Sequence, residues 1–215
     1  MKVIDLGITD YLEAYEIQMG LVKEVSAGIS EDTLLITEHR PVITIGRKGS
    51  WDSILRSKEE LFSRGIDVFN IDRGGDVTYH SPGQIVSYPI FRLIDEARDI
   101  HNFLDFLEAV GKSFLMQYGI ISEDRPGDRG LWVEGKKIGS IGIGVKKWVT
   151  YHGIAINIDP DMAPFSFIKP CGMESVKVTS LRDVLCREID LEDAKSKLEL
   201  SFKKVSLLAS AVSSN

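Results

Sequence analysis

The segment from residue 131 to residue 158 constrains the fold most strongly, because it reads as consecutive β-strands with glycines inside them. Turn signals at Glu134-Gly135-Lys136 and near Lys146-Lys147 divide it into three runs. Gly139, Gly142 and Gly144 lie within the middle run. Glycine inside a strand usually marks a place where a ligand or another chain segment approaches the backbone closely. We therefore expect a sheet whose glycine-rich strand is contacted in this way.

Helical and β patterns alternate irregularly along the rest of the chain. A helix is expected after Asp10, where Glu13 completes a capping-box pattern, and it should end at Ala27-Gly28. Further helices are expected over 58–64, over 103–118 with Gly119 as the stop, and over 194–208. Strands are expected at 34–36, 42–45, 66–71, 77–79 and 85–91, with the first two paired to each other.

This irregular order favours one fold class over another. A doubly wound parallel sheet requires regular strand-helix alternation, which the pattern lacks. We predict an α+β fold, a mixed β-sheet sandwich flanked by helices, formed as a single domain over residues 1–215. A chain of 215 residues with 43% hydrophobic content can bury one substantial core.

Composition limits the partners and the compartment. A net charge of −6 argues against a nucleic-acid-binding protein, which needs clustered basic residues. No run of eighteen apolar residues occurs and no signal peptide is evident, so we expect a cytoplasmic protein without a membrane association. A reducing compartment would keep Cys171 and Cys186 as thiols. We expect a monomer.

The two cysteines differ in their surroundings. Cys171 lies between Pro170 and Gly172 in a loop, which makes it a candidate nucleophile, although an inert thiol fits the same position. A catalytic thiol would need a neighbouring cation or base to form the thiolate. Cys186 ends an apolar helical turn, and core packing explains it adequately.

The histidines and glycine pairs give weaker signals. The spacing of His39, His80, His101 and His152 does not match common zinc sites, so no metal site is expected. His80 and His152 lie beside glycine-containing loops and are the better site candidates, whereas His101 at a helix start is expected to be structural. Arg73-Gly74-Gly75 could cradle a phosphate, but a tight turn fits it equally.

Four blocks together resemble the signatures of one enzyme family. The blocks are Arg73 to Gln84, Lys136 to Gly142, His152 to Asn157 and Pro170-Cys171-Gly172, in this order over about 100 residues. They look like those of the octanoyl-[acyl-carrier-protein]:protein N-octanoyltransferases. The resemblance implies the fold of the lipoate and biotin protein ligase catalytic domains, which agrees with the α+β prediction.

The resemblance also implies a reaction. An octanoyl group would pass from octanoyl-acyl carrier protein to the acceptor lysine of a lipoyl domain, in protein lipoylation and without a cofactor. The acceptors would be the lipoyl domains of 2-oxoacid dehydrogenase E2 subunits and the glycine cleavage H protein. By position, Cys171 matches the nucleophile that carries the acyl group, and Lys137 matches its acid/base partner in a Cys-Lys dyad.

Three stretches match the acyl-binding segments of the family. The implied substrate-binding residues are Arg73, Gly74, Gly75, Asp76, Val77, Thr78, Tyr79 and His80, then Ser140, Ile141 and Gly142, then Gly153, Ile154 and Ala155. The chain departs from the family pattern at Arg40, Ser81 and Gly139, which affects local loop shape and fine substrate preference.

Three alternatives remain open. An ATP-dependent lipoate or biotin ligase would use Lys137 for an adenylated intermediate and would need no cysteine. An amidotransferase would move octanoyl between two lipoyl-domain proteins by cysteine chemistry. A catalytically silent acyl-protein binding module would retain the pocket, and the presence of both Cys171 and Lys137 argues against it.

Overall fold

The computed structural model describes residues 1–94, 99–125, 127–169 and 176–212. Among these residues, one sheet has the strand order β1-β2-β6-β9-β8-β7 and a smaller sheet has the order β4-β3-β5. The strands of the larger sheet are β1 (Lys2–Thr9), β2 (Thr33–His39), β6 (Gln84–Ile90), β7 (Leu131–Val133), β8 (Lys136–Lys146) and β9 (Val149–Asn157). The smaller sheet contains β3 (Val42–Ile45), β4 (Asp67–Asn70) and β5 (Val77–His80). Parallel and antiparallel pairs occur in both sheets, so the mixed α+β prediction is confirmed.

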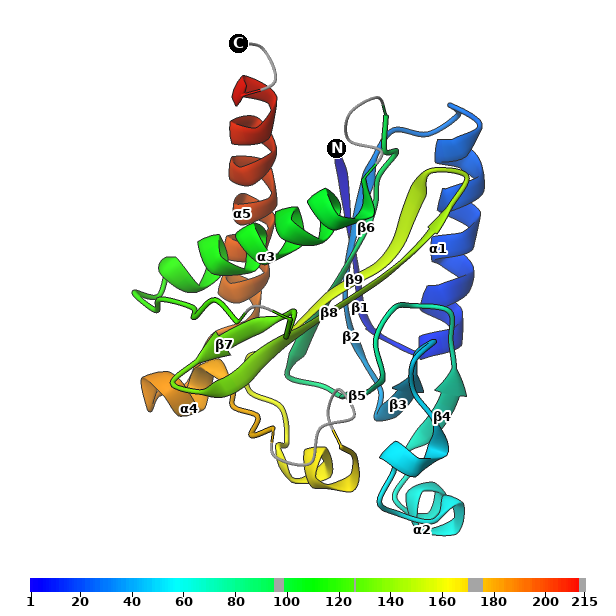
Figure 1. The fold of residues 1–215 in the computed structure, drawn as a ribbon, viewed down its shortest axis with the longest axis vertical. Helices are drawn as coiled ribbons and strands as arrows, with labels where there is room; N and C mark the ends of the chain where they lie inside the picture. Colours follow the sequence, from blue (N-terminus) through cyan, green and yellow to red (C-terminus); the bar gives the residue numbers. More distant parts are fainter. Residues whose placement is uncertain (95–98, 126, 170–175, 213–215) are drawn as a thin grey trace.

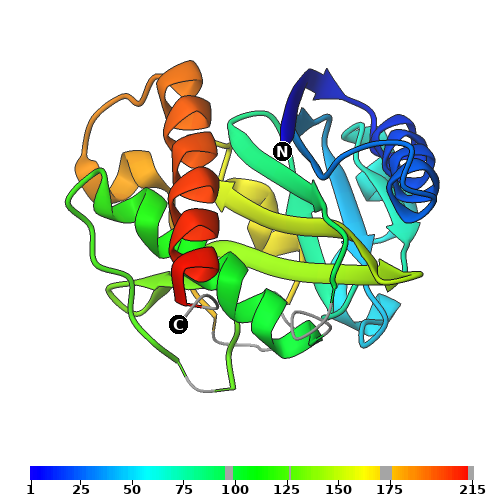
Figure 2. The same ribbon diagram turned by 90° about the horizontal axis from the view of Figure 1, so that it is seen from above.

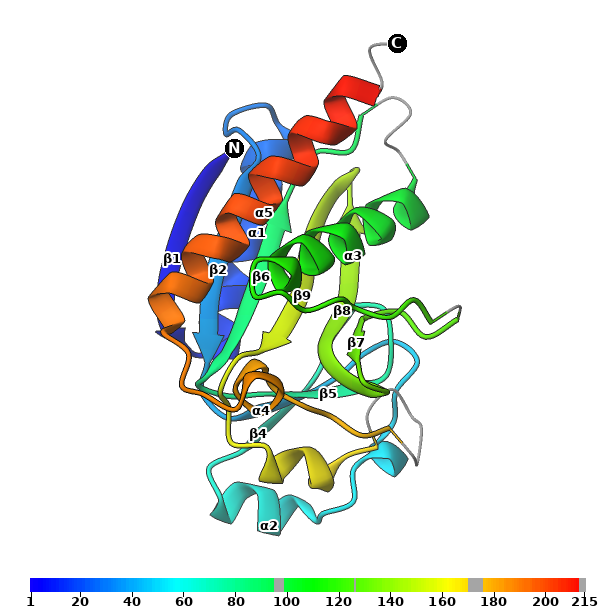
Figure 3. The same cartoon turned by 90° about the vertical axis from the view of Figure 1, so that its left-hand side faces the viewer.

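Helices cover both faces of the larger sheet (Figures 1 and 2). The first helix, α1 (Tyr11–Ser26), packs on one face, where its apolar side meets β6 and β9. On the opposite face lie α3 (Ile100–Met116) and α5 (Leu191–Val212), which contact each other (Figure 3). Helix α4 (Leu181–Leu185) joins this second layer. The largest core cluster lies between the sheet and α3 with α5, and Leu107, Phe114 and Phe202 are fully buried in it.

The smaller sheet lies at one end of the larger one and has its own core (Figure 1). Helix α2 (Lys58–Ser63) and the short 3-10 helices η1 (Trp51–Ser53) and η3 (Ala163–Phe167) pack around it. Its core includes Ile43, Leu61, Tyr79 and Phe165. The molecule therefore has one apolar cluster around the smaller sheet and another between α1 and the larger sheet. The ring of Tyr11, the first residue of α1, packs on Phe69 of β4.

The structure corrects the predicted pairing of the first two strands. Strand β2 pairs with β1 and β6, whereas β3 pairs with β4 and β5, so the two strands belong to different sheets. Arg40 and Pro41 connect them. A tight hairpin favours glycine or asparagine at its turn positions, and Pro41 instead fixes φ and lacks an N–H donor. The chain consequently passes from one sheet to the other.

Two features at the N-terminus also differ from the prediction. Strand β1 was not expected; it is an exposed edge strand, and its register shifts between Asp5 and Ile8, where Gly7 has φ +61°. Because the strand is interrupted, its apolar and polar residues do not alternate regularly, and the sequence pattern does not reveal it. Asp10 precedes α1 as expected, but its carboxylate makes no capping hydrogen bond and instead pairs with Arg40 Nε at 3.1 Å.

Candidate active site

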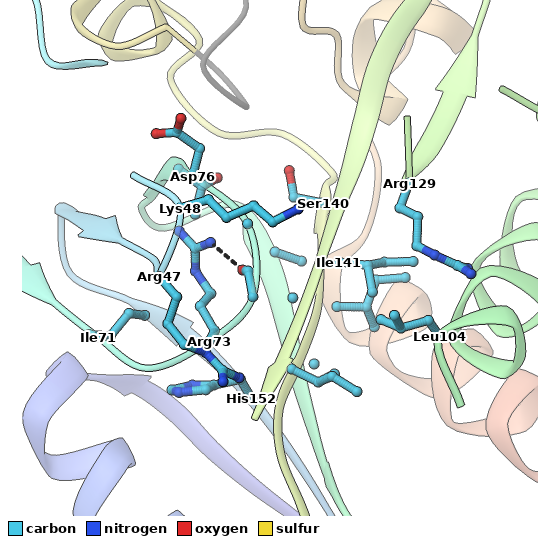
Figure 4. A pocket seen from close by; sticks show the side chains of 18 of the residues that line it. Arg47, Lys48, Ile71, Arg73, Asp76, Leu104, Arg129, Ser140, Ile141 and His152 are labelled. Carbon is cyan, nitrogen blue, oxygen red and sulfur yellow. Dashed lines mark hydrogen bonds between the residues drawn. The ribbon is translucent and has the colours of Figure 1, made fainter. Parts of the chain in front are cut away.

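A cavity of about 640 Å³ lies between the α1 face of the larger sheet and the residues around β5 (Figure 4). It also passes round the edge of β8, so that Arg73, Ser140 and His152 lie on one side of this strand and Leu104 and Ile141 on the other. Thirteen of the predicted substrate-binding residues line it, namely Arg73, Gly74, Gly75, Asp76, Val77, Thr78, His80, Ser140, Ile141, Gly142, Gly153, Ile154 and Ala155. The segment 73–80 and two segments of the β8–β9 hairpin, about 60 residues later in the sequence, thus meet at one cavity.

Tyr79 is the predicted substrate-binding residue that does not line the cavity. Successive side chains of a strand point to opposite faces, so Tyr79 turns away from the cavity while Thr78 and His80 turn towards it. The Tyr79 ring packs edge-on against Phe165 with centroids 5.4 Å apart, inside the core of the smaller sheet.

Small side chains form the cavity floor on the larger sheet. Ser140 on β8 is in register with Ala155 on β9, and Ala155 is in register with Val86 on β6. Paired residues project from the same face of a sheet, so these three make a row that crosses the strands. Gly142 and Gly153 are also in register with each other. A Cβ on Gly142 would meet Gly74 O at 2.8 Å, and a Cβ on Gly153 would meet Ser87 O at 2.2 Å, so the room for a narrow ligand lies over the small side chains of Ser140 and Ala155.

The loop Arg73-Gly74-Gly75 closes the cavity by docking on the free edge of β8. Gly74 N donates to Ile143 O at 2.9 Å, and a Cβ on Gly142 would lie 2.8 Å from Gly74 O. The Arg73 guanidinium donates to Thr44 O at 2.8 Å and is nearly buried. The predicted close approach to the glycine-rich strand is therefore made by another segment of the chain, and the cavity lies beside the contact.

Lys137 lies at the beginning of β8, with its side chain 3% exposed. Its Nζ donates to Arg129 O at 3.0 Å and lies 5.2 Å from the centroid of the Trp132 ring. The lysine also lines the cavity. A buried ammonium group facing a cavity is well placed to exchange protons with a bound reactant.

Cys171 lies outside the described residues, but the chain that follows it is anchored next to Lys137. Lys137 N donates to Lys177 O at 2.8 Å, and Thr179 N donates to Lys137 O at 2.9 Å. On the preceding side, Lys169 N donates to Ser53 O at 2.8 Å. Val176, the first described residue after Cys171, thus directly precedes Lys177, which bonds to the backbone of Lys137.

A polar network connects this region with β6 and β9. Asn157 Nδ2 donates to Thr179 O at 2.9 Å, and Gln84 Nε2 donates to Asn157 Oδ1 at 2.8 Å. The Gln84 Oε1 atom accepts from His80 Nδ1 at 2.6 Å. Each of these side chains is buried, so the network fixes the tautomer of His80 and holds the segment after Cys171 against β9.

Three buried histidines near the cavity are neutral at pH 7. Burial lowers the pKa of His39 to about 4 and that of His80 to about 3, and it lowers the pKa of His152 as well. His152 Nε2 donates to Asp72 Oδ1 at 3.0 Å, and this bond is the main reason that the pKa of Asp72 falls to about 2. This wall of the cavity is therefore polar but carries no histidine charge.

The sequence did not single out several residues that line the cavity. These residues are Tyr11, Val86 and Tyr88 and also Arg47, Lys48, Ile100, His101, Leu104 and Arg129. The basic pair Arg47-Lys48 directly after a strand was a detectable signal, since loops after strands often carry binding groups. The aromatic residues gave none, because a tyrosine at helical spacing also fits a core position.

Two of the secondary predictions need correction. Cys186 is exposed rather than packed in the core, because it ends α4 in a left-handed conformation with φ +51°. His101, expected to be structural, is an exposed residue on the cavity wall. Within the described part of the chain, no helix is both long and apolar enough to span a bilayer.

Comparison with known proteins places the chain in a family. The model of the lipoyl protein ligase A/B catalytic domain matches residues 10–203. An octanoyltransferase of Caldicellulosiruptor saccharolyticus is 46% identical over 95% of this chain and 88% of its own length. An octanoyltransferase of Geobacter sulfurreducens is 43% identical over 94% of this chain and 83% of its own length.

Solved structures show the same fold. Lipoate-protein ligase A bound with ATP matches with a TM-score of 0.73 at 15% identity, covering 95% of this chain and 84% of the ligase. Biotin protein ligase from Aquifex aeolicus in complex with biotin and ATP matches with a TM-score of 0.57 at 12% identity, covering 95% and 69%. The likeness to the ligases concerns the fold, whereas the sequence identities concern the family. The chain belongs to the lipoyl protein ligase A/B catalytic domain family and, within it, to the octanoyltransferases.

Proposed function

We propose that this chain transfers an octanoyl group from the thioester of an acyl carrier protein to the acceptor lysine of a lipoyl domain, in protein lipoylation. The observation that carries the proposal is that the motif segment 73–80 and the β8–β9 hairpin, about 60 residues later in the sequence, line one cavity, with Lys137 buried at its wall. The family membership supports the octanoyl substrate.

The proposed reaction has two acyl-transfer steps. The Cys171 thiolate attacks the thioester carbonyl, the bond to the carrier sulfur breaks, and the Lys137 ammonium protonates the departing thiolate. The neutral amine of the acceptor lysine then attacks acyl-Cys171. An amide forms, the Cys171 thiolate leaves, and the amine proton passes to Lys137. In the net reaction the acyl group moves from the thiol of the carrier protein to the amine of the acceptor lysine, so the reaction needs neither ATP nor a redox partner.

The geometry supports Lys137 in this role. Its side chain lies along the cavity wall, and the segment that follows Cys171 pairs with its backbone on both sides of Val178. The carbonyl of Arg129 and the ring of Trp132 hold the ammonium group in one place. A fixed proton donor costs less reorganisation during the reaction than a mobile one.

The floor of small residues supports an acyl substrate. A fatty acyl tail is narrow and apolar, and each methylene removed from water contributes about 0.8 kcal/mol. Ser140, Ala155 and Val86 offer a path of this width across the sheet. We further propose that the chain acts in the cytoplasm as a monomer and that its acceptors are lipoyl domains of E2 subunits and of the glycine cleavage H protein.

A transfer assay without ATP tests the proposal. The chain is mixed with octanoyl-acyl carrier protein and a purified lipoyl domain, and the mass of the lipoyl domain is followed. We expect one octanoyl amide per acceptor lysine. Amide formation that requires ATP and free octanoate would favour the ligase, and transfer from an octanoylated lipoyl domain alone would favour the amidotransferase. No acyl transfer from any donor would overturn the proposal.

A further inference from the structure

The hydroxyl of Tyr11 is buried beside the cavity without a partner. Tyr11 is 4% exposed and lines the cavity, and within the described residues its Oη has no hydrogen-bond partner. The hydroxyl of the neighbouring Tyr88 is satisfied, since it donates to His39 Nε2 at 2.6 Å. A buried unpaired hydroxyl is unfavourable unless a molecule in the cavity bonds to it. Burial also raises the pKa of Tyr11, so the group remains a donor.

Tyr11 lies where the cavity floor ends. The row Ser140, Ala155 and Val86 crosses from β8 to β6, and the rings of Tyr11 and Tyr88 both contact the His39 ring, with centroids 5.6 and 5.8 Å away. The Tyr11 ring is held in place on its other side by Phe69, at 5.7 Å. A ligand that enters at the edge of β8 and follows this row therefore meets two tyrosines.

The length of the row matches an eight-carbon chain. Two inter-strand spacings separate β8 from β6, which is about 10 Å. Seven carbon–carbon bonds of about 1.5 Å, in an extended zigzag, span about 9 Å. An octanoyl tail that crosses the row from β8 would consequently end at Tyr11.

We propose that Tyr11 sets the acyl-chain length that this enzyme accepts, an inference that rests on the proposed octanoyl transfer. An eight-carbon tail stops at the Tyr11 ring, and the hydroxyl remains buried and out of reach of solvent. The ninth and tenth carbons of a longer tail would press against the ring and place methylenes beside an unpaired donor, which is unfavourable. The Tyr11 ring limits the length of the tail sterically, and its unpaired hydroxyl disfavours the burial of further methylenes against it.

The position of the tail on this side of β8 is favoured by the small side chains of the floor. Ser140 and Ala155 are in register with each other and both line the cavity. On the other side of the strand, Ile141 and Leu104 fill the cavity with large side chains, and the charged Arg129 lies beside them (Figure 4). The narrow path across the sheet therefore fits an extended acyl tail better.

Chain-length preference in the Tyr11→Phe variant tests this inference. The variant keeps the ring and its packing and removes only the unpaired hydroxyl, so we expect it to fold with an unchanged or higher Tm. The readout is the ratio of kcat/KM for decanoyl- over octanoyl-acyl carrier protein, with a lipoyl domain as acceptor. We expect this ratio to rise about fivefold or more, because two methylenes become buried against an apolar edge. Binding of decanoate relative to octanoate, measured by calorimetry, should shift in the same direction.

Tyr15→Phe is the matched control. Tyr15 lies on the same helix and its ring packs on Tyr11 and His152, but it does not line the cavity. Its ratio should equal that of the wild type. An unchanged ratio in Tyr11→Phe, or an equal rise in both variants, would overturn the inference while octanoyl transfer by the wild type continues. Absence of octanoyl transfer by the wild type would instead overturn the proposed function and, with it, this inference.

Discussion

The side chain of Lys137 passes directly beneath Gly130. A Cβ added to Gly130 would lie 2.7 Å from both Lys137 Cε and Gly139 O, closer than a methyl group tolerates, and 3.2 Å from Lys137 Nζ. Gly130 also has φ +136°, a conformation that other residues rarely adopt. The absence of a side chain at residue 130 is thus one condition for the position of the Lys137 ammonium.

Gly130→Ala should therefore reduce transfer by displacing Lys137. A shift of about 1 Å in a catalytic group can lower the rate about a hundredfold, and we expect a loss of this order in kcat with a smaller change in KM. The control is Gly119→Ala, which also has positive φ (+74°) but has no atom within 4 Å of its added Cβ. The control should lose stability and keep kcat. Equal kcat values for the two variants would contradict this account of Gly130.

Substitution of the proposed dyad should separate its two roles. Cys171→Ala should abolish octanoyl transfer, because no nucleophile remains to accept the acyl group. Lys137→Met preserves the length of a buried apolar stem and removes the ammonium, so the chain should fold while acylation slows by 10²-fold or more, as the loss of a general acid/base predicts. Single-turnover acylation rates provide the measurement, and turnover at the wild-type rate in either variant would refute the assigned role.

Two glycines should respond oppositely to alanine in a stability measurement. A Cβ on Gly144 would lie 2.3 Å from Cζ of the Tyr151 ring, whose hydroxyl donates to Asp72 Oδ2 at 2.5 Å. Gly144→Ala should lower the free energy of unfolding by about 1–3 kcal/mol through overpacking. Gly20 lies exposed within α1 with open space around it, so Gly20→Ala should raise that free energy by about 0.5–1 kcal/mol. Urea unfolding measures both, and equal signs would contradict the packing described.

The buried histidines should make the fold sensitive to mild acid. Their pKa values are about 4 for His39 and about 3 for His80 in the folded chain, against about 6.5 when unfolded. The unfolded chain then binds more protons below pH 6.5, so stability present above that pH is lost as the pH falls towards 4 and 3. Each histidine contributes a slope of at most about 1.4 kcal/mol per pH unit.

Comparison of variants isolates this contribution from that of the carboxylates. His39→Asn should flatten the dependence of the unfolding free energy on pH between 6.5 and 4. The same substitution at the exposed His101 is the control. Urea unfolding at several pH values within this range provides the data. A slope in His39→Asn as steep as that of the wild type would show that the His39 proton does not contribute.

Local patterns in the sequence predicted most helices and strands. The apolar spacing that predicted a helix over 103–118 corresponds to α3, and the glycine-interrupted run corresponds to β8 with β9 beside it. These elements are specified by residues near one another in the chain. Strand β1 escaped prediction because an irregular edge strand depends on its partner β2, which follows α1.

Pairing and burial depended on distant residues. The sequence does not show that β2 and β3 separate into two sheets, since their partners β6 and β5 come about 50 and about 35 residues later. It also does not show that Gly74 docks on Ile143, or that Tyr11 at the start of α1 reaches the cavity. Family motifs identified the residues of the cavity wall that lie within a motif, but they did not identify isolated lining residues such as Tyr11, which lie outside any motif.

The central claim is that Cys171 carries the octanoyl group during transfer. Intact-mass analysis of the chain after incubation with octanoyl-acyl carrier protein, without acceptor and without ATP, tests it directly. The account predicts one octanoyl adduct per chain, located on the peptide that contains Cys171 and removed when a lipoyl domain is added. Formation of octanoylated lipoyl domain without any adduct on Cys171 would contradict it.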